Sequence, residues 1–205
     1  YWPYRAQLVL RTCKVSGDAS AQRPARPGRA VGVAVASDGA RARARAWAGR
    51  PVDLLVGGSR VDSLGALERT ACLAFSPDGH WLVSTHGDGS ILVWDVDART
   101  RTANLRGHSN PVRAVTFSGD GKRIASASED HSIIIWNVQT GRKESVILGH
   151  ETRINSVAFS SDSQWLAATD QDRTTVLWDA AQQQAKWKVT DDGATGYCVA
   201  LSSDG

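Results

Sequence analysis

The sequence predicts an all-β fold built from one unit that repeats along the chain. Trp94, Trp136 and Trp178 are spaced evenly by 42 residues, and a Gly-His pair recurs with the same step at 107–108 and 149–150. Between these marks, short runs of Val, Ile, Ala and Thr alternate with Gly, Asp and Ser, which favours strands over helices. A fixed period of about 40–45 residues with Gly-His and Trp-Asp marks is typical of a radial β repeat.

Each clear unit contains three strong strand patterns followed by a weaker fourth. The strands are separated by Asp, Gly and Ser residues, which supply the positive φ angles or the side-chain caps that tight turns require. In chain order, the predicted strands are Thr70–Phe75, Trp81–Thr85, Ser90–Val96, Thr102–Leu105, Pro111–Phe117, Lys122–Ala127, Ser132–Val138, Glu144–Leu148, Ile154–Phe159, Trp165–Thr169, Thr174–Trp178, Ala185–Val189 and Gly196–Leu201.

Residues 66–205 are therefore predicted to hold three clear units and the start of another. Residues 1–30 contain Ser, Ala, Arg and Pro without periodicity, which is typical of an irregular linker or a degraded segment. Residues 31–65 look like a degenerate blade, a worn copy in which Val52-Asp53 lies 42 residues before Trp94-Asp95. Three interpretations of this copy stay open: a terminal unit with one face in water, a degraded unit, or sequence read in a shifted frame.

Charge is distributed unevenly along the 205 residues, whose formal net charge is +3. Residues 1–69 hold 12 Lys and Arg against 5 Asp and Glu, whereas residues 70–205 hold 12 against 16. The basic excess thus lies outside the clear units, and no aromatic stacking platform accompanies its arginine run, so we expect no nucleic-acid partner. No apolar run approaches the roughly 18 residues of a membrane span, so we expect no membrane partner.

Neither a metal site nor a cofactor is expected. Cys13, Cys72 and Cys198 show neither pairing nor metal-ligand spacing, which favours a reducing compartment and a cytoplasmic location. The stretch Gly119–Lys122 lacks the first glycine of a phosphate-binding loop. The aspartates around position 171 lack the remaining ligands of a calcium loop.

The Gly-His and Trp-Asp marks over residues 65–205 resemble those of the WD-repeat family of β-propellers. The resemblance implies four antiparallel strands per blade, with the blades arranged around a central channel. The chain holds a little under five periods, the first of them poorly formed. We therefore expect an incomplete ring, truncated at both ends and completed by further sequence.

The resemblance also implies a hydrogen-bonded tetrad in each blade, made of the His of Gly-His, a turn Asp, a strand Ser or Thr, and the Trp. A neutral imidazole can relay such a chain, because Trp donates one N–H and a hydroxyl both accepts and donates. The unit before the middle one has Ala66 in place of His, and the unit after it has Ala168 in place of the hydroxyl. The residues expected in these structural sets are His108, Ser126 (or Ser128), Asp130 and Trp136; Ser84, Asp88 and Trp94; and His150, Asp172 and Trp178.

A His, Ser and Asp set is also the composition of a catalytic triad. No Gly-x-Ser-x-Gly elbow is present, so we expect no catalytic residue. The expected function is a non-enzymatic scaffold for protein–protein interaction within a larger signalling or regulatory protein, and the alternative is the propeller of an enzyme, a quinoprotein-like dehydrogenase or a hydrolase. Because functional residues lie disproportionately on loops, the residues expected to contact a protein or peptide partner are Asn110, Glu129, Arg153 and Gln171.

Overall fold

The computed structural model describes residues 30–35, 42–47, 52–56, 59–64, 70–191 and 198–201. In the first four ranges it places backbone strands only. The irregular segment expected over residues 1–30 lies outside the described residues apart from Ala30. Its interpretation, and the division of the chain at residues 30 and 65, stay predictions.

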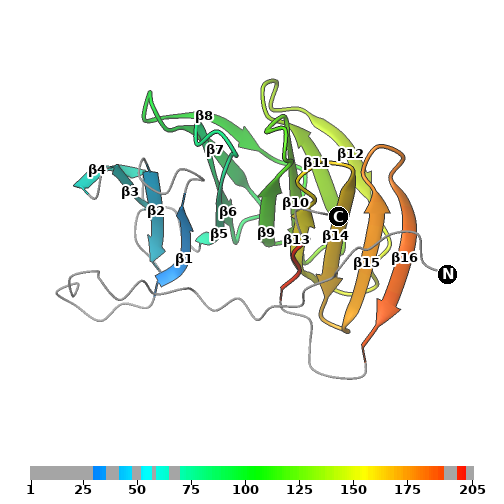
Figure 1. Cartoon of the computed structure of the whole chain (residues 1–205). Helices are drawn as coiled ribbons and strands as arrows, with labels where there is room; N and C mark the ends of the chain where they lie inside the picture. The colour runs from blue at the N-terminus through cyan, green and yellow to red at the C-terminus, as the bar shows by residue number, and fades with distance from the viewer. Residues whose placement is uncertain are drawn as a thin grey trace.

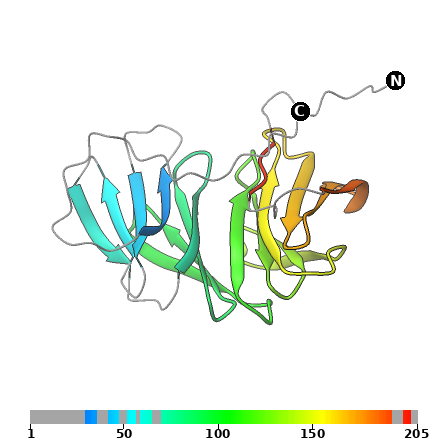
Figure 2. The same cartoon turned by 90° about the horizontal axis from the view of Figure 1, so that it is seen from below.

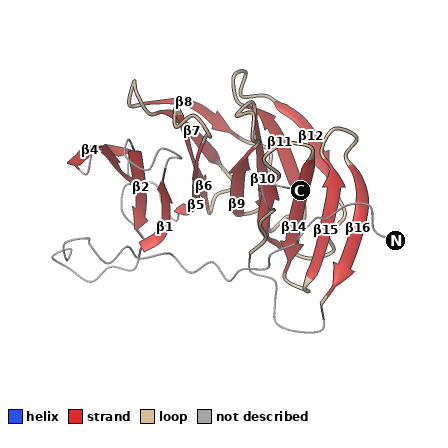
Figure 3. Ribbon diagram, in the orientation of Figure 1, coloured by secondary structure: helices blue, strands red, loops and turns tan. Residues whose placement is uncertain are grey.

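All secondary-structure elements among the described residues are strands, and they form four antiparallel sheets of four strands each (Figures 1 and 3). Within each sheet the strands follow chain order, so each connection is a hairpin. The N-terminal sheet comprises β1 (Ala30–Val35), β2 (Ala42–Trp47), β3 (Val52–Val56) and β4 (Ser59–Leu64). The part of the chain that the structure describes contains no helix long and apolar enough to cross a membrane.

We call the other three sheets blades 1, 2 and 3. Their bounds agree with the predicted strands to within one or two residues at most ends, because the alternation of strand and turn residues is regular. Blade 1 comprises β5 (Thr70–Phe75), β6 (Trp81–His86), β7 (Ile91–Asp95) and β8 (Thr100–Leu105); blade 2 comprises β9 (Val112–Phe117), β10 (Arg123–Ser128), β11 (Ile133–Asn137) and β12 (Lys143–Ile147); blade 3 comprises β13 (Ile154–Phe159), β14 (Trp165–Asp170), β15 (Thr174–Asp179) and β16 (Gln184–Thr190).

The first strands of the four sheets lie together along one side of the molecule. Strand β1 contacts β5, β5 contacts β9, and β9 contacts β13. From this shared inner side the sheets fan out as blades, and they do not close into a ring (Figures 1 and 2). The expected all-β architecture, a partial propeller of four-stranded antiparallel blades, is confirmed.

The core lies between neighbouring blades. Blades 1 and 2 share one apolar cluster, which includes Val93 and Leu105 from one blade and Trp136 from the other. Blades 2 and 3 share a second cluster, which includes Ile147 from one blade and Phe159 from the other. A central strand of a blade is covered on both faces, so its sequence is a nearly continuous apolar run. The stability of each blade therefore depends on its packing against the neighbouring blades.

The turn between the first and second strands repeats in all three blades. In blade 2, Ser118 Oγ donates to Asp120 Oδ1 at 2.5 Å, and the same carboxylate oxygen accepts from the backbone N–H of Lys122 at 3.1 Å. Gly121 completes the turn with a φ of 69°. The Ser76–Asp78 and Ser160–Asp162 pairs make the same bond at 2.5 Å, so the Ser-x-Asp pattern in the sequence is a side-chain cap.

Two expectations fail near the C-terminal end of the described residues. Residues 198–201 form no strand, in contrast to the predicted strand Gly196–Leu201, although Val199 is buried and its N–H donates to Ser156 Oγ at 3.1 Å. Cys72 is a free thiol, but Cys198 is disulfide-bonded. The expectation that no cysteine is paired is therefore wrong for Cys198.

Candidate functional site

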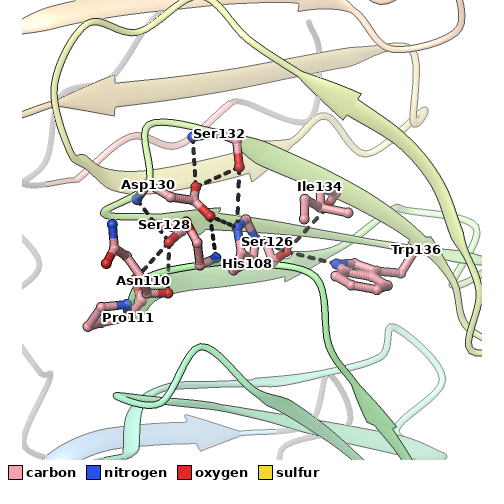
Figure 4. Close-up of polar contacts among 10 residues, drawn as sticks. His108, Asn110, Pro111, Ser126, Ser128, Asp130, Ser132, Ile134 and Trp136 are labelled. Carbon is pink, nitrogen blue, oxygen red and sulfur yellow. Dashed lines mark hydrogen bonds and ion pairs between the residues drawn. The ribbon is translucent and has the colours of Figure 1, made fainter.

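The residues expected in the complete tetrad lie together in blade 2. His108 Nδ1 is 2.8 Å from Asp130 Oδ2, and His108 Nε2 is 2.8 Å from Ser126 Oγ (Figure 4). Trp136 Nε1 donates to the same hydroxyl oxygen at 2.8 Å. A single chain of hydrogen bonds thus links the loop before β9, strand β10, the turn after it and strand β11. We call this chain of bonds the brace of blade 2.

Burial sets the charge state of this brace. Burial lowers the pKa of His108 below its ordinary value, and the hydrogen bond with Asp130 acts in the opposite direction without reversing the shift. With a neutral imidazole, Nδ1–H donates to the carboxylate and Nε2 accepts from the Ser126 hydroxyl. That hydroxyl in turn accepts the Trp136 N–H, so each buried group of the brace is satisfied.

The turn carboxylate of Asp130 is held by several donors. Burial acts to raise its pKa, but hydrogen bonds from Ser132 and His108 outweigh burial and lower it. Its Oδ1 accepts from the Ser132 hydroxyl at 2.6 Å and from the Ser132 N–H at 3.0 Å. Its Oδ2 also accepts from the Ser109 N–H at 3.0 Å. An ionised Asp130 therefore ties the loop before β9 to the turn between β10 and β11.

Blade 1 builds its brace differently, since the loop position equivalent to His108 carries alanine. His86, at the end of β6, places Nε2 at 3.0 Å from Ser84 Oγ, and Trp94 Nε1 donates to that oxygen at 3.2 Å. The ring of His86 is 2% exposed, and its Nδ1 has no partner among the described residues. His86 thus takes the place of the missing loop histidine.

The expectation that Asp88 belongs to the brace of blade 1 is therefore wrong. Its Oδ1 accepts from the Ser90 hydroxyl at 2.5 Å and from the Ser90 N–H at 3.0 Å, and its Oδ2 lies 3.3 Å from Arg106. None of these bonds joins the brace, because His86 approaches Ser84 from the same strand. Asp88 instead caps the turn and pairs with an exposed arginine.

Blade 3 differs again, and its predicted aspartate is wrong. His150 Nδ1 bonds Asp170 Oδ2 at 2.8 Å, whereas Asp172 is exposed on the turn. Asp170 ends strand β14, and its Oδ1 accepts from the Thr174 N–H at 2.8 Å. This carboxylate is almost fully buried beside the imidazole, which leaves no role for Asp172 in the brace.

The hydroxyl missing from blade 3 leaves a visible defect. With Ala168 in place of Ser126, the buried Nε2 of His150 has no hydrogen-bond partner within the described ranges. The rings of His150 and Trp178 remain in contact, with their centroids 5.5 Å apart. Burial lowers the pKa of His150, and the hydrogen bond that His150 Nδ1–H donates to Asp170 opposes this shift.

The offset of 42 residues could have revealed His86 and Asp170, the two residues that sequence reasoning missed. Both occupy the repeat position that Ser128 occupies in blade 2. An ionisable residue at a position that is otherwise a small hydroxyl is the signal, because a buried charge or imidazole requires a partner. In blade 2 the Ser128 hydroxyl instead donates to the carbonyl of Asn110 at 3.0 Å.

The loop residues expected to contact a partner lie at one end of the blades, which we call the loop edge. The Glu129 N–H donates to the Pro111 carbonyl at 3.0 Å, and the Gln171 N–H donates to the Arg153 carbonyl at 3.0 Å. These bonds hold each loop before a first strand beside a turn between second and third strands. Asn110, Arg153 and Gln171 are exposed.

Glu129 differs from the other three loop residues in being half-buried and already paired. Arg113 Nε donates to Glu129 Oε1 at 2.6 Å, and Arg113 Nη2 contacts the same oxygen. The charge of Glu129 is thus neutralised within the chain, and it is less accessible to a partner than its neighbours.

The arrangement of His108, Ser126 and Asp130 suits a structural role rather than a catalytic one. Ser126 is fully buried and already accepts the Trp136 N–H, so it is not placed to attack a substrate. Among the described residues there is no group of three or more His, Cys, Asp and Glu side chains that could hold a metal ion. The site is a set of buried braces beneath an exposed polar edge.

Stacked four-stranded blades with such a brace define a β-propeller repeat. The family model described as WD domain, G-beta repeat matches residues 68–95, 99–137 and 141–179, which together make up more than half of the chain. The chain belongs to the WD-repeat family. WD repeats are generally protein-interaction scaffolds, and proteins built from them are usually non-enzymatic. No curated protein matches the chain.

Proposed function

We propose that this chain is a non-enzymatic scaffold that binds a protein or peptide partner through its loop edge, within a larger signalling or regulatory protein. The observation that carries the proposal is the use of the His108, Ser126 and Asp130 set in a buried brace. Its polar groups are satisfied inside blade 2. The exposed polar residues are left on the rigid edge above it, where a partner can reach them.

The test compares two triple variants of equal size. The first replaces the exposed loop-edge residues Asn110, Arg153 and Gln171 with alanine. The second replaces Arg101, Thr140 and Arg142, which are exposed at the opposite ends of the strands. After cross-linking and affinity capture, we expect the first variant to lose the cross-linked partner and the second to keep it. Equal capture by both variants would contradict binding at the loop edge.

A serine-directed fluorophosphonate probe tests the alternative, a propeller that carries a hydrolase activity. Because Ser126 is fully buried, we expect no labelling of this residue in the folded chain. Labelling of Ser126 that disappears in Ser126→Ala would support the hydrolase instead. We expect neither nucleic-acid nor membrane partners, and a cytoplasmic location stays a prediction that fractionation of cells would check.

A further inference from the structure

A polar cleft lies between blades 2 and 3 at the ends of the strands opposite to the loop edge. Its volume is about 370 Å³, and its lining includes Asp120 and Arg123 from blade 2 with Asp162, Trp165 and Asp179 from blade 3. Strands β10 and β13 are in contact here (Figure 1). A cleft of this size has room for one long side chain and the backbone that carries it.

Each of the three aspartates in the cleft has one carboxylate oxygen engaged in its own turn. Asp120 Oδ1 and Asp162 Oδ1 each accept from the serine hydroxyl of their own Ser-x-Asp turn. Asp179 Oδ1 accepts from the Gln182 N–H at 2.8 Å. No second carboxylate oxygen has a hydrogen-bond partner among the described residues. Hydrogen bonding from Ser160 lowers the pKa of Asp162. The cleft therefore presents fixed, unpaired negative charge.

Arg123 attracts one of these carboxylates without pairing with it, because its charge helps to lower the pKa of Asp120. Its guanidinium lies over the Phe159 ring, 5.9 Å from the centroid. Within the described part of the chain it makes no ion pair with Asp120, Asp162 or Asp179. With three carboxylates and one guanidinium that faces an aromatic ring, the lining carries an excess of negative charge.

Blade 1 places an imidazole at the equivalent turn. There His80 Nδ1 lies 2.8 Å from Asp97 Oδ2, and the His80 ring stands edge-on to the Trp81 ring, with the two centroids 6.4 Å apart. The chain thus supplies its own imidazole beside the tryptophan of that turn. In blade 3 the residues at the two paired positions are Gln164 and Ala181, so the aromatic ring and the acidic turn remain while the internal pair is absent.

We propose that the cleft between blades 2 and 3 binds a lysine or arginine side chain of a protein partner. The half-exposed indole of Trp165 offers a face for a cation, and Asp162 and Asp179 offer the charge. This inference rests on the proposed scaffold function and adds a second contact surface, with a defined partner chemistry, to the loop edge.

Capped short peptides that differ only at a central lysine, arginine, norleucine or glutamate test the proposal. The readout is the NMR signal of the Trp165 indole N–H in the full chain. We expect the lysine and arginine peptides to shift this signal saturably, and the norleucine and glutamate peptides to leave it unchanged. Absence of saturable shifts with the two basic peptides, or equal shifts with norleucine, would overturn the proposal.

Matched variants separate charge from turn geometry. Asp162→Asn with Asp179→Asn keeps the Oδ1 acceptors and removes the charges, and we expect roughly three- to tenfold weaker binding, as for exposed ion pairs. Asp78→Asn with Asp95→Asn makes the same change in the turns of blade 1 and should leave the affinity unaltered. Equal losses in the two double variants would show a structural effect and refute the cleft.

A third variant places a fixed cation of the chain itself in the cleft. Gln164→Lys puts an ammonium group at the position equivalent to His80, next in sequence to Trp165, and it should weaken the binding of the lysine and arginine peptides. Unchanged binding would contradict a cation site. Because the capped peptides report on the cleft alone, their failure to bind leaves the loop-edge proposal standing, and a failed loop-edge test leaves the cleft to be judged by the peptides.

Discussion

Ser84 Oγ lies 3.0 Å from His86 Nε2, so blade 1 completes its brace with a histidine from the same strand. In blade 2 the equivalent hydroxyl meets a histidine from the preceding loop, at 2.8 Å. The repeat position of His86 is Ser128 in blade 2 and Asp170 in blade 3. The three blades therefore share a backbone, and the residue at this position joins the brace in blades 1 and 3 but not in blade 2.

His86→Ala should destabilise the chain, because it leaves the buried Ser84 hydroxyl without its imidazole partner and opens a cavity. We expect a loss of about 1–3 kcal/mol in the free energy of unfolding. The Ser84→Ala, His86→Ala double variant should lose less than the sum of the two single variants, since both remove one interaction. His80→Ala is the control, because that histidine is exposed. Additive losses in denaturant unfolding would contradict the pairing.

Ala168→Ser should stabilise blade 3. The new hydroxyl would occupy the place of Ser126 and donate to His150 Nε2, which is buried and has no partner in the part of the chain that the structure describes. A newly satisfied buried acceptor is worth about 0.5–1.5 kcal/mol. Ala167→Ser is the matched control, because Ala167 is equally buried but its side chain projects from the opposite face of the strand. We expect a higher unfolding midpoint for Ala168→Ser and a lower one for Ala167→Ser.

The strand positions could be predicted from the sequence because turn residues recur at a constant offset. The predicted strand Trp165–Thr169 is β14, which ends one residue later at Asp170. The fold class and the blade 2 brace follow from the same regularity. A repeated backbone is encoded by the local pattern of strand and turn residues, and a single sequence contains that pattern.

The choice of partner within a brace could not be predicted in this way. The offset from Trp178 indicates Asp172 as the partner of His150, but the buried partner is Asp170, two residues earlier on the strand. Asp170 is buried and bonds His150, whereas Asp172, two residues later, is exposed. A residue offset encodes neither the burial of a carboxylate nor its distance from the imidazole. The same holds for His86, which replaces a loop histidine from a different direction.

Gly119 is required where the turns of blades 2 and 3 meet. A Cβ atom at this position would lie 1.8 Å from the Ser161 carbonyl oxygen. Gly119→Asn should therefore cost about 3 kcal/mol, the upper end for overpacking. Gly121→Asn is the control: its φ is 69°, which asparagine tolerates, and its Cβ would lie 3.7 Å from Pro77. Similar unfolding midpoints for the two variants would contradict this close approach of the blades.

Hydrogen exchange should be slowest in blade 2, whose brace is complete and whose faces are covered by blades 1 and 3. The amides of β10 and β11 should exchange more slowly than those of β6, β7, β14 and β15, because local opening of blade 2 breaks a fully satisfied network. Exchange measured residue by residue checks this order. Faster exchange in β10 and β11 than in either neighbour would refute it.

Stability should fall as the pH decreases below the ordinary histidine value of about 6.5. Burial lowers the pKa values of His86, His108 and His150, with nearby carboxylates opposing. Below pH 6.5 the unfolded chain gains protons that the folded chain does not accept, so the free energy of unfolding decreases until the lowered pKa values are reached.

The aspartates with lowered pKa values, Asp130 among them, change the stability with pH only at lower pH. Their stabilisation is lost as the pH falls below their ordinary value, so between pH 7.5 and 5.5 the histidines dominate. Urea unfolding at these two pH values should give a lower midpoint at pH 5.5. His86→Gln should reduce the difference, because it removes one of the three buried imidazoles. A pH-independent midpoint in the parent chain would show that the three rings are not buried as neutral groups.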